Sequence, residues 1–130
     1  MSGDGLTGVW YGRWVSDDAY VPPNRFIALI EEQAGAVRGT TSEPDDLGGA
    51  PVRATLYGTR SGSAVQWIKQ YDGAGPLAHA VFYVGEVRDE ATRIDGTWQF
   101  AGYAGTFVME RETFSAAELA EEIGLEVPVG

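Results

Sequence analysis

Hydrophobic residues along the chain occur in short segments rich in β-branched and aromatic side chains, and glycines separate these segments. Side chains of both kinds favour strands, and no helix-length apolar stripe appears among the segments. The pattern predicts eight strands, near 7–15, 25–32, 36–42, 51–59, 63–71, 78–87, 91–100 and 104–112. Short strands at such even spacing are typical of an all-β sandwich or barrel rather than of βαβ units.

One helix signal follows the last strand. The sequence Ser-Ala-Ala-Glu at 115–118 fits a capping box, in which two side chains satisfy free backbone amides, and Gly124 is a natural stop. We therefore expect a single domain, with a β-barrel over about 6–113 and a short C-terminal helix over about 115–124.

The connections between the predicted strands alternate in length. Those after the first, third and fifth strands are long, and those after the second, fourth and sixth are tight turns. In an up-and-down antiparallel barrel, connections of the same parity lie at the same end. We therefore expect one closed end and one end rimmed by long loops, with the mouth of a cavity at the long-loop end.

The run Thr-Gly-Val-Trp-Tyr at 7–11 resembles the Gly-x-Trp start of calycin barrels, the group that includes lipocalins, fatty-acid-binding proteins and avidins. In those families an arginine at the end of the last strand packs across this tryptophan at the closed end. The resemblance implies that Arg111 stacks on Trp10 and closes the floor of the barrel, because a guanidinium packs well on an indole face.

Avidins come nearest in detail. The segments 65–71 and 94–98, with His79 between them, look like the avidin strands that supply biotin-stacking tryptophans, which implies cavity positions for Trp67 and Trp98. Ser16 matches a biotin-binding serine. The other positions that hold polar biotin ligands carry different residues here, namely Gly12, Thr41, Glu43, Ala80 and Phe82. A ureido group left unpaired would cost about 1–3 kcal/mol per polar atom, so biotin binding is not expected. The pattern is also similar to bacterial lipocalin-like domains of unassigned function.

Four tryptophans are many for such a chain. Because side chains alternate along a strand, an inward Trp10 places Trp14 inward as well. The residues expected around a ligand in the upper barrel are Trp14, Phe26, Trp67, Lys69, Tyr71, His79, Trp98 and Phe100. The same pattern also fits a barrel filled by its own side chains, as small eight-stranded barrels often are.

Lys69 is the only lysine and His79 the only histidine. Both are expected near the mouth, where they could anchor a ligand carbonyl, carboxylate or phenol. We prefer a simpler interpretation, in which the lysine reaches solvent at the rim and the histidine caps a strand end. A minor alternative makes these two residues and Tyr71 the acid–base groups of an isomerase or cyclase; otherwise no catalytic residue is expected.

Six carboxylates lie in the expected mouth loops, namely Asp17, Asp18, Glu43, Asp45, Asp46 and Asp72. They lack the Asp-x-Asp-x-Asp-Gly spacing of a calcium loop, so they indicate a solvated acidic rim. Cysteine is absent and histidine is single, so neither thiol chemistry nor a metal site nor another cofactor is expected.

The formal net charge of −10 disfavours contact with phosphate backbones and anionic lipids, so neither nucleic acid nor a membrane is expected as a partner. The first residues lack the features of a signal peptide, which predicts a cytoplasmic protein.

The leading hypothesis is non-enzymatic binding of a small, neutral, mostly apolar or aromatic ligand at the long-loop end. The alternative is a self-filled barrel that acts as a protein-interaction or oligomerisation domain. A homodimer through the outer wall would use Val9, Tyr11, Val81 and Tyr83.

Overall fold

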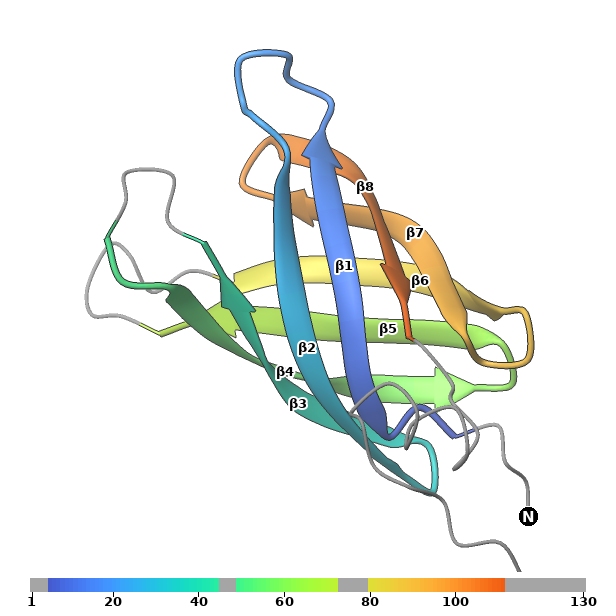
Figure 1. Ribbon diagram of the computed structural model, residues 1–130. Helices are drawn as coiled ribbons and strands as arrows, with labels where there is room; N and C mark the ends of the chain where they lie inside the picture. Colours follow the sequence, from blue (N-terminus) through green and yellow to red (C-terminus); the bar gives the residue numbers. More distant parts are fainter. Residues whose placement is uncertain (1–4, 45–48, 73–79, 112–130) are drawn as a thin grey trace, which may run out of the picture.

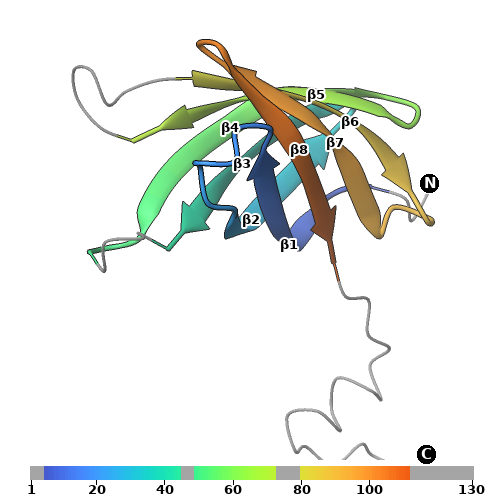
Figure 2. The ribbon, with the colours of Figure 1, turned by 90° about the horizontal axis from the view of Figure 1, so that it is seen from above.

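The computed structural model describes residues 5–44, 49–72 and 80–111 of the chain. They form a closed barrel of eight antiparallel strands, each paired with the next in the sequence, and the last strand pairs with the first (Figure 1). The strands are β1 (Gly8–Ser16), β2 (Asn24–Gln33), β3 (Ala36–Glu43), β4 (Val52–Ser61), β5 (Ala64–Tyr71), β6 (Ala80–Arg88), β7 (Arg93–Phe100) and β8 (Tyr103–Glu110). Figure 2 shows β8 running back beside β1, where it closes the barrel.

This architecture confirms the predicted eight-stranded antiparallel up-and-down barrel. The expected helix over about 115–124 and the side chain of His79 lie outside the described residues. No helix within the described part of the chain has the length and hydropathy of a membrane span.

Side chains alternate between the interior and the outer wall. In β2, Phe26 and Ala28 are buried, whereas Ile27 between them is about half exposed. The same alternation corrects the expectation for β6. Val81 and Tyr83 face the interior and not the outer wall, because their pairing with inward positions of β5 fixes the parity. The outward residues of this strand include Phe82 and Val84, which are about half exposed.

Glycine at two inward positions makes room for large rings. A Cβ atom at Gly12 would overlap the ring of Phe26, and one at Gly105 would overlap the indole of Trp98. Strands β1 and β8 therefore pass close to aromatic side chains that project from their neighbours. Gly12 thus leaves space for the ring of Phe26.

The closed end is sealed by the predicted contact between Arg111 and Trp10. The guanidinium carbon lies 4.7 Å from the centroid of the indole ring, which is completely buried. Arg111 also donates hydrogen bonds to the carbonyl oxygens of Ala91 at 2.8 Å, Thr7 at 2.9 Å and Gly5. One side chain thereby ties the end of the barrel to the segment that precedes β1 and to the turn before β7. This geometry confirms the expectation drawn from the resemblance.

At the opposite end, β2 and β3 diverge. Strand β2 pairs with β1 as far as Asn24, but its pairing with β3 begins only at Ile27, opposite Ser42. The first residues of β2 therefore have no strand on their β3 side. Figure 1 shows the β1–β2 hairpin extending away from the end of β3. The divergence opens the wall of the barrel beside the mouth.

Candidate functional site

A buried carboxylate lies at the centre of the upper barrel. Glu43, the last residue of β3, accepts hydrogen bonds at Oε2 from Lys69 Nζ at 2.9 Å and from the Tyr71 hydroxyl at 2.7 Å. Its other oxygen, Oε1, accepts a hydrogen bond from Trp14 Nε1 at 2.8 Å. We call these four residues the polar centre. Both carboxylate oxygens are therefore engaged by donors from two other strands, β1 and β5.

The register of the strands explains how these side chains meet. Lys69 and Tyr71 point inward from β5, and Glu43 points inward from β3, with β4 between them. The inward residue of β4 at this level is Ala54, which pairs with Tyr71 on one side and with Thr41 on the other. Because alanine fills little of the interior, the longer side chains of β3 and β5 can reach each other across it.

Two expectations about charged residues are wrong. Lys69 does not reach solvent at the rim, and Glu43 does not belong to a solvated acidic loop, since their side chains are only 2% and 3% exposed. Strand β3 continues through Glu43 and turns it inward, where the lysine, the phenol and the indole satisfy its oxygens. A charged pair is tolerated in the interior when its hydrogen bonds are completed in this way.

The polar centre is enclosed by aromatic rings. Lys69 Nζ lies 4.6 Å from the ring centroid of Tyr71, 5.4 Å from that of Tyr83 and 5.5 Å from that of Phe26. Burial lowers the pKa of Lys69, and the nearby charge of Glu43 opposes this change. Burial, together with the charge of Glu43, raises the pKa of both tyrosines, so their hydroxyls stay protonated at neutral pH.

A mouth pocket of about 280 Å³ opens above the polar centre, at the long-loop end. Its walls carry two aromatic pairs: Trp14 and Trp98 meet edge to face at 5.8 Å, and Phe100 stacks with Tyr103 at 6.5 Å. The full lining is Trp14, Ser16, Val21, Tyr71, Val81, Tyr83, Trp98, Phe100 and Tyr103. Flat apolar faces therefore stand directly above the buried charges.

A second opening, the side cleft, follows from the divergence of β2 and β3. Its volume is about 610 Å³, and Gly12, Phe26 and Glu43 contribute to its inner surface. Residues of the outer wall and loops complete it, namely Tyr11, Arg25, Ile27, Ser42, Pro44 and Pro51. Glu43 lines this cleft, while its hydrogen-bond partners Trp14 and Tyr71 line the mouth pocket. The polar centre thus lies between the two openings.

The residues expected around a ligand fall into five groups. Those that line the mouth pocket are Trp14, Tyr71, Trp98 and Phe100. Phe26 lines the side cleft, and Lys69 is buried between the two openings. Trp67 lines neither opening and packs instead in the core, against Tyr83 at 6.1 Å and Phe107 at 5.9 Å. His79 lies outside the described residues.

Sequence reasoning missed three residues of this site. Glu43 was assigned to a loop, Tyr83 was assigned to the outer wall, and Tyr103 was not considered. The period-two alternation of β6 could have placed Tyr83 on the inner face, because Ala80 and Phe82 lie on the opposite face of the strand.

Among the described residues, no group of three or more histidine, cysteine, aspartate or glutamate side chains is arranged to hold a metal ion. A scan against protein-family models finds no match for the chain, and a search of curated proteins finds none either. The barrel itself is compatible with a calycin-like fold.

Proposed function

We propose that this protein binds a small, neutral, mostly apolar or aromatic molecule non-covalently in the mouth pocket. The observation that carries the proposal is the pair of aromatic walls, Trp14 with Trp98 and Phe100 with Tyr103, around an opening of about 280 Å³. Small-molecule sites are commonly apolar pockets of about 300–1,000 Å³ with a few polar groups at fixed places. The mouth pocket has this character, with a volume just below that range and the polar centre beneath it.

The interior below the pocket limits the length of the ligand. Tyr83 and Phe107 pack edge to face at 4.9 Å, and Trp67 lies against both rings. A long acyl chain would have to displace this packed layer. The pocket therefore favours a compact ring system over a fatty acid.

The charges favour a neutral ligand. The ammonium group of Lys69 is already paired with Glu43, and both are buried. A ligand carboxylate in the pocket would lose its hydration without gaining a free counter-charge, which is costly in an apolar site. The net charge of −10 also slows the approach of anions.

Two features support a place among calycin-like barrels. The chain has the Gly-x-Trp start, and Arg111 lies across Trp10 at the closed end. In such barrels the ligand cavity opens at the opposite end, which here is the end of the mouth pocket.

Titration of tryptophan fluorescence tests the proposal, because Trp14 and Trp98 line the pocket. We expect 2-naphthol to quench the emission at micromolar concentration and oleate to have little effect. Phe100→Ala should weaken 2-naphthol binding about two- to twelve-fold, the equivalent of about 0.5–1.5 kcal/mol for a lost aromatic contact. Phe82→Ala is the matched control, since this ring lies half exposed on the outer wall. Tight binding of oleate with no response to 2-naphthol would contradict the proposal.

Native mass spectrometry of protein purified without denaturation gives an independent test. We expect a bound molecule of low mass, and the same spectrum reports the number of subunits.

The outer wall supports a second candidate function, self-association. Val9 pairs with Leu29 and Tyr11 with Ile27 across β1 and β2, and all four side chains are about half exposed. A continuous apolar strip of this kind is typical of a contact surface. The occupant we consider is a second copy of the chain, because two-fold dimers are the commonest soluble oligomers. Sedimentation velocity at micromolar concentration would show a dimer, and a monomer would contradict this candidate.

A further inference from the structure

The chain contains eight arginines and a single lysine, and that lysine is buried in the interior. Arginine is the usual cation of a permanent buried ion pair, because its guanidinium stays charged and binds a carboxylate through two parallel hydrogen bonds. A buried lysine differs chemically, since its amine can lose a proton and become a nucleophile. The choice of lysine at position 69 therefore adds a reactivity that arginine would not have.

The surroundings of Lys69 suit an amine that exchanges its proton. Glu43 Oε2, at 2.9 Å from Nζ, is placed to accept that proton. Burial lowers the pKa of the amine, although the charge of Glu43 opposes this effect. On the inner face of β3, two residues before Glu43, Thr41 Oγ1 is buried and has no hydrogen-bond partner among the described residues. This hydroxyl is a donor available inside the barrel.

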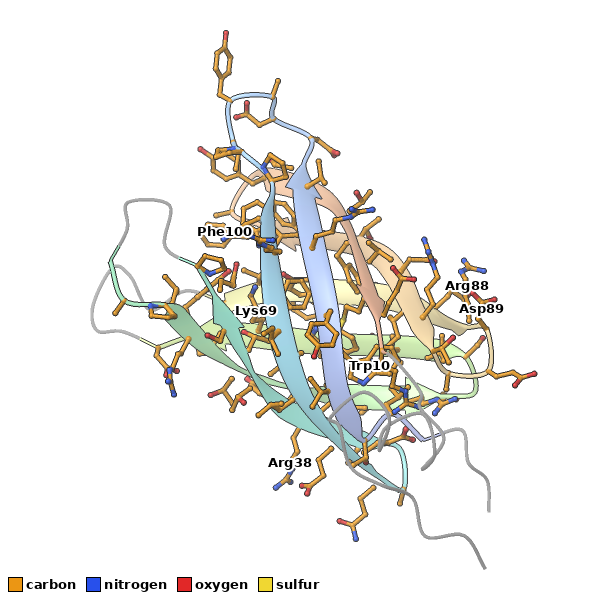
Figure 3. All side chains as sticks on the ribbon, in the orientation of Figure 1. Trp10, Arg38, Lys69, Arg88, Asp89 and Phe100 are labelled. Atoms are coloured by element: carbon orange, nitrogen blue, oxygen red, sulfur yellow. The ribbon has the colours of Figure 1, made fainter. Side chains whose placement is uncertain are left out.

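The amine lies behind two rings that line the mouth pocket. The rings of Tyr71 and Tyr83 line the pocket, and their centroids are 4.6 and 5.4 Å from Lys69 Nζ. Figure 3 shows Lys69 between Phe100, toward the mouth, and Trp10, toward the floor. The flexible four-carbon stem of a lysine allows Nζ to move toward the pocket once its pairing with Glu43 is released.

We propose that Lys69 captures an aromatic aldehyde in the mouth pocket as a reversible imine, with Glu43 as the proton acceptor and counter-ion. This inference rests on the proposed function, because the aldehyde must first bind among the aromatic walls. A primary amine forms imines with carbonyl compounds, so an aldehyde is a ligand that can attach to the single lysine.

The reaction balances without an oxidant or a reductant. Glu43 takes a proton from the ammonium group, and the nitrogen lone pair of Lys69 attacks the carbonyl carbon. The π electrons move to the carbonyl oxygen. The oxygen receives the proton held by Glu43 and a second proton from the attacking nitrogen, and it leaves as water while the C=N bond forms, so ammonium group and aldehyde give protonated imine and water. The protonated imine keeps the positive charge opposite the carboxylate.

Reductive trapping tests the proposal on the full chain. The protein is incubated with micromolar 2-naphthaldehyde and sodium cyanoborohydride at neutral pH, and the adduct is located by peptide mass mapping. We expect one adduct per chain, at Lys69, and little at the α-amino group.

Arg53→Lys supplies a matched control, because residue 53 is an exposed position on the outer face of β4. The introduced lysine should react at least ten-fold less than Lys69 in the same molecule. In a second variant, Lys69→Arg, the cation is kept and the primary amine is removed. The internal adduct should then disappear, while circular dichroism reports whether the barrel is folded. If this variant does not fold, the ratio between positions 69 and 53 decides the question alone.

The outcomes distinguish this inference from the function on which it rests. If 2-naphthol and 2-naphthaldehyde both quench tryptophan fluorescence but no adduct forms at Lys69, the imine is refuted and the non-covalent site stands. If neither compound binds, both proposals are wrong. Equal labelling of Lys69 and of the lysine introduced at position 53 would also refute selective capture.

Discussion

Removing the amine of Lys69 while leaving Glu43 in place should strongly destabilise the barrel. In Lys69→Met, the carboxylate keeps its hydrogen bonds from Trp14 and Tyr71 but loses its counter-charge in an interior where both partners are at most 3% exposed. Breaking a buried ion pair from one side typically costs about 3–5 kcal/mol, because the remaining charge stays desolvated. We expect a loss of that size in the free energy of unfolding.

Urea denaturation followed by tryptophan fluorescence measures this effect. With a slope of about 2 kcal/mol per molar urea, the midpoint should fall by about 1.5–2.5 M. Trp14 is a local reporter, since its indole N–H donates to the same carboxylate.

A double variant provides the decisive comparison. In Lys69→Met with Glu43→Gln, no uncompensated charge remains, and the amide oxygen can still accept a hydrogen bond from Trp14 or Tyr71. Exchanging a whole buried pair for neutral groups is often close to neutral in stability, so most of the loss should be recovered. The reasoning is refuted if the single variant loses less than about 1 kcal/mol, as a surface pair would. It is also refuted if the double variant is no more stable than the single one.

Three further predictions follow from other parts of the barrel. Arg111→Ala removes the stacking and the hydrogen bonds at the floor and should lower the free energy of unfolding, measured by urea denaturation, by about 1–2 kcal/mol. Arg38→Ala on the outer wall is the control and should change it by less than about 0.5 kcal/mol. Equal losses in the two variants would contradict the floor contact. The pKa values of Tyr71 and Tyr83 are raised in the folded state, so the unfolded chain releases these protons first; stability should fall as the pH rises above the ordinary tyrosine value of 10.0, and Tyr83→Phe should flatten the fall in a pH series of unfolding midpoints. A slope unchanged in Tyr83→Phe would count against that assignment. If the chain is a dimer, Tyr11→Asp should convert it to a monomer in sedimentation velocity, since this exposed ring is central to the β1–β2 strip.

The strands and the floor could be predicted because their determinants are local or fixed by topology. Segment pattern and turn length located all eight strands, and an up-and-down order places the start of β1 beside the end of β8. The contact between Trp10 and Arg111 then requires only that both residues lie at the same end. Parity along a strand similarly placed Trp14 on the inner face with Trp10.

Depth within the barrel was harder to predict. Trp67 and Trp98 both face inward, yet Trp98 reaches the mouth pocket and Trp67 packs in the core against Tyr83 and Phe107. How far an inward side chain lies from the mouth depends on the stagger between neighbouring strands, which is a property of the closed sheet. The sequence of a single strand does not contain that information.

The polar centre was missed for a related reason, and its presence is itself informative. Whether Lys69 is buried depends on Glu43, its partner 26 residues away. Taken alone, a lysine near the end of a strand is expected to reach solvent, and so is a carboxylate in a loop. A hydrophobic pair of similar volume would often stabilise a barrel as well or better, so stability alone does not account for two charges in this place. Their position fits a role in binding, because Glu43 lines the side cleft and its partner Tyr71 lines the mouth pocket. The two roles separate in experiment. If the pair is purely structural, Lys69→Arg leaves the aldehyde labelling of the folded protein unchanged. If Lys69 captures aldehydes, the same variant loses the internal adduct.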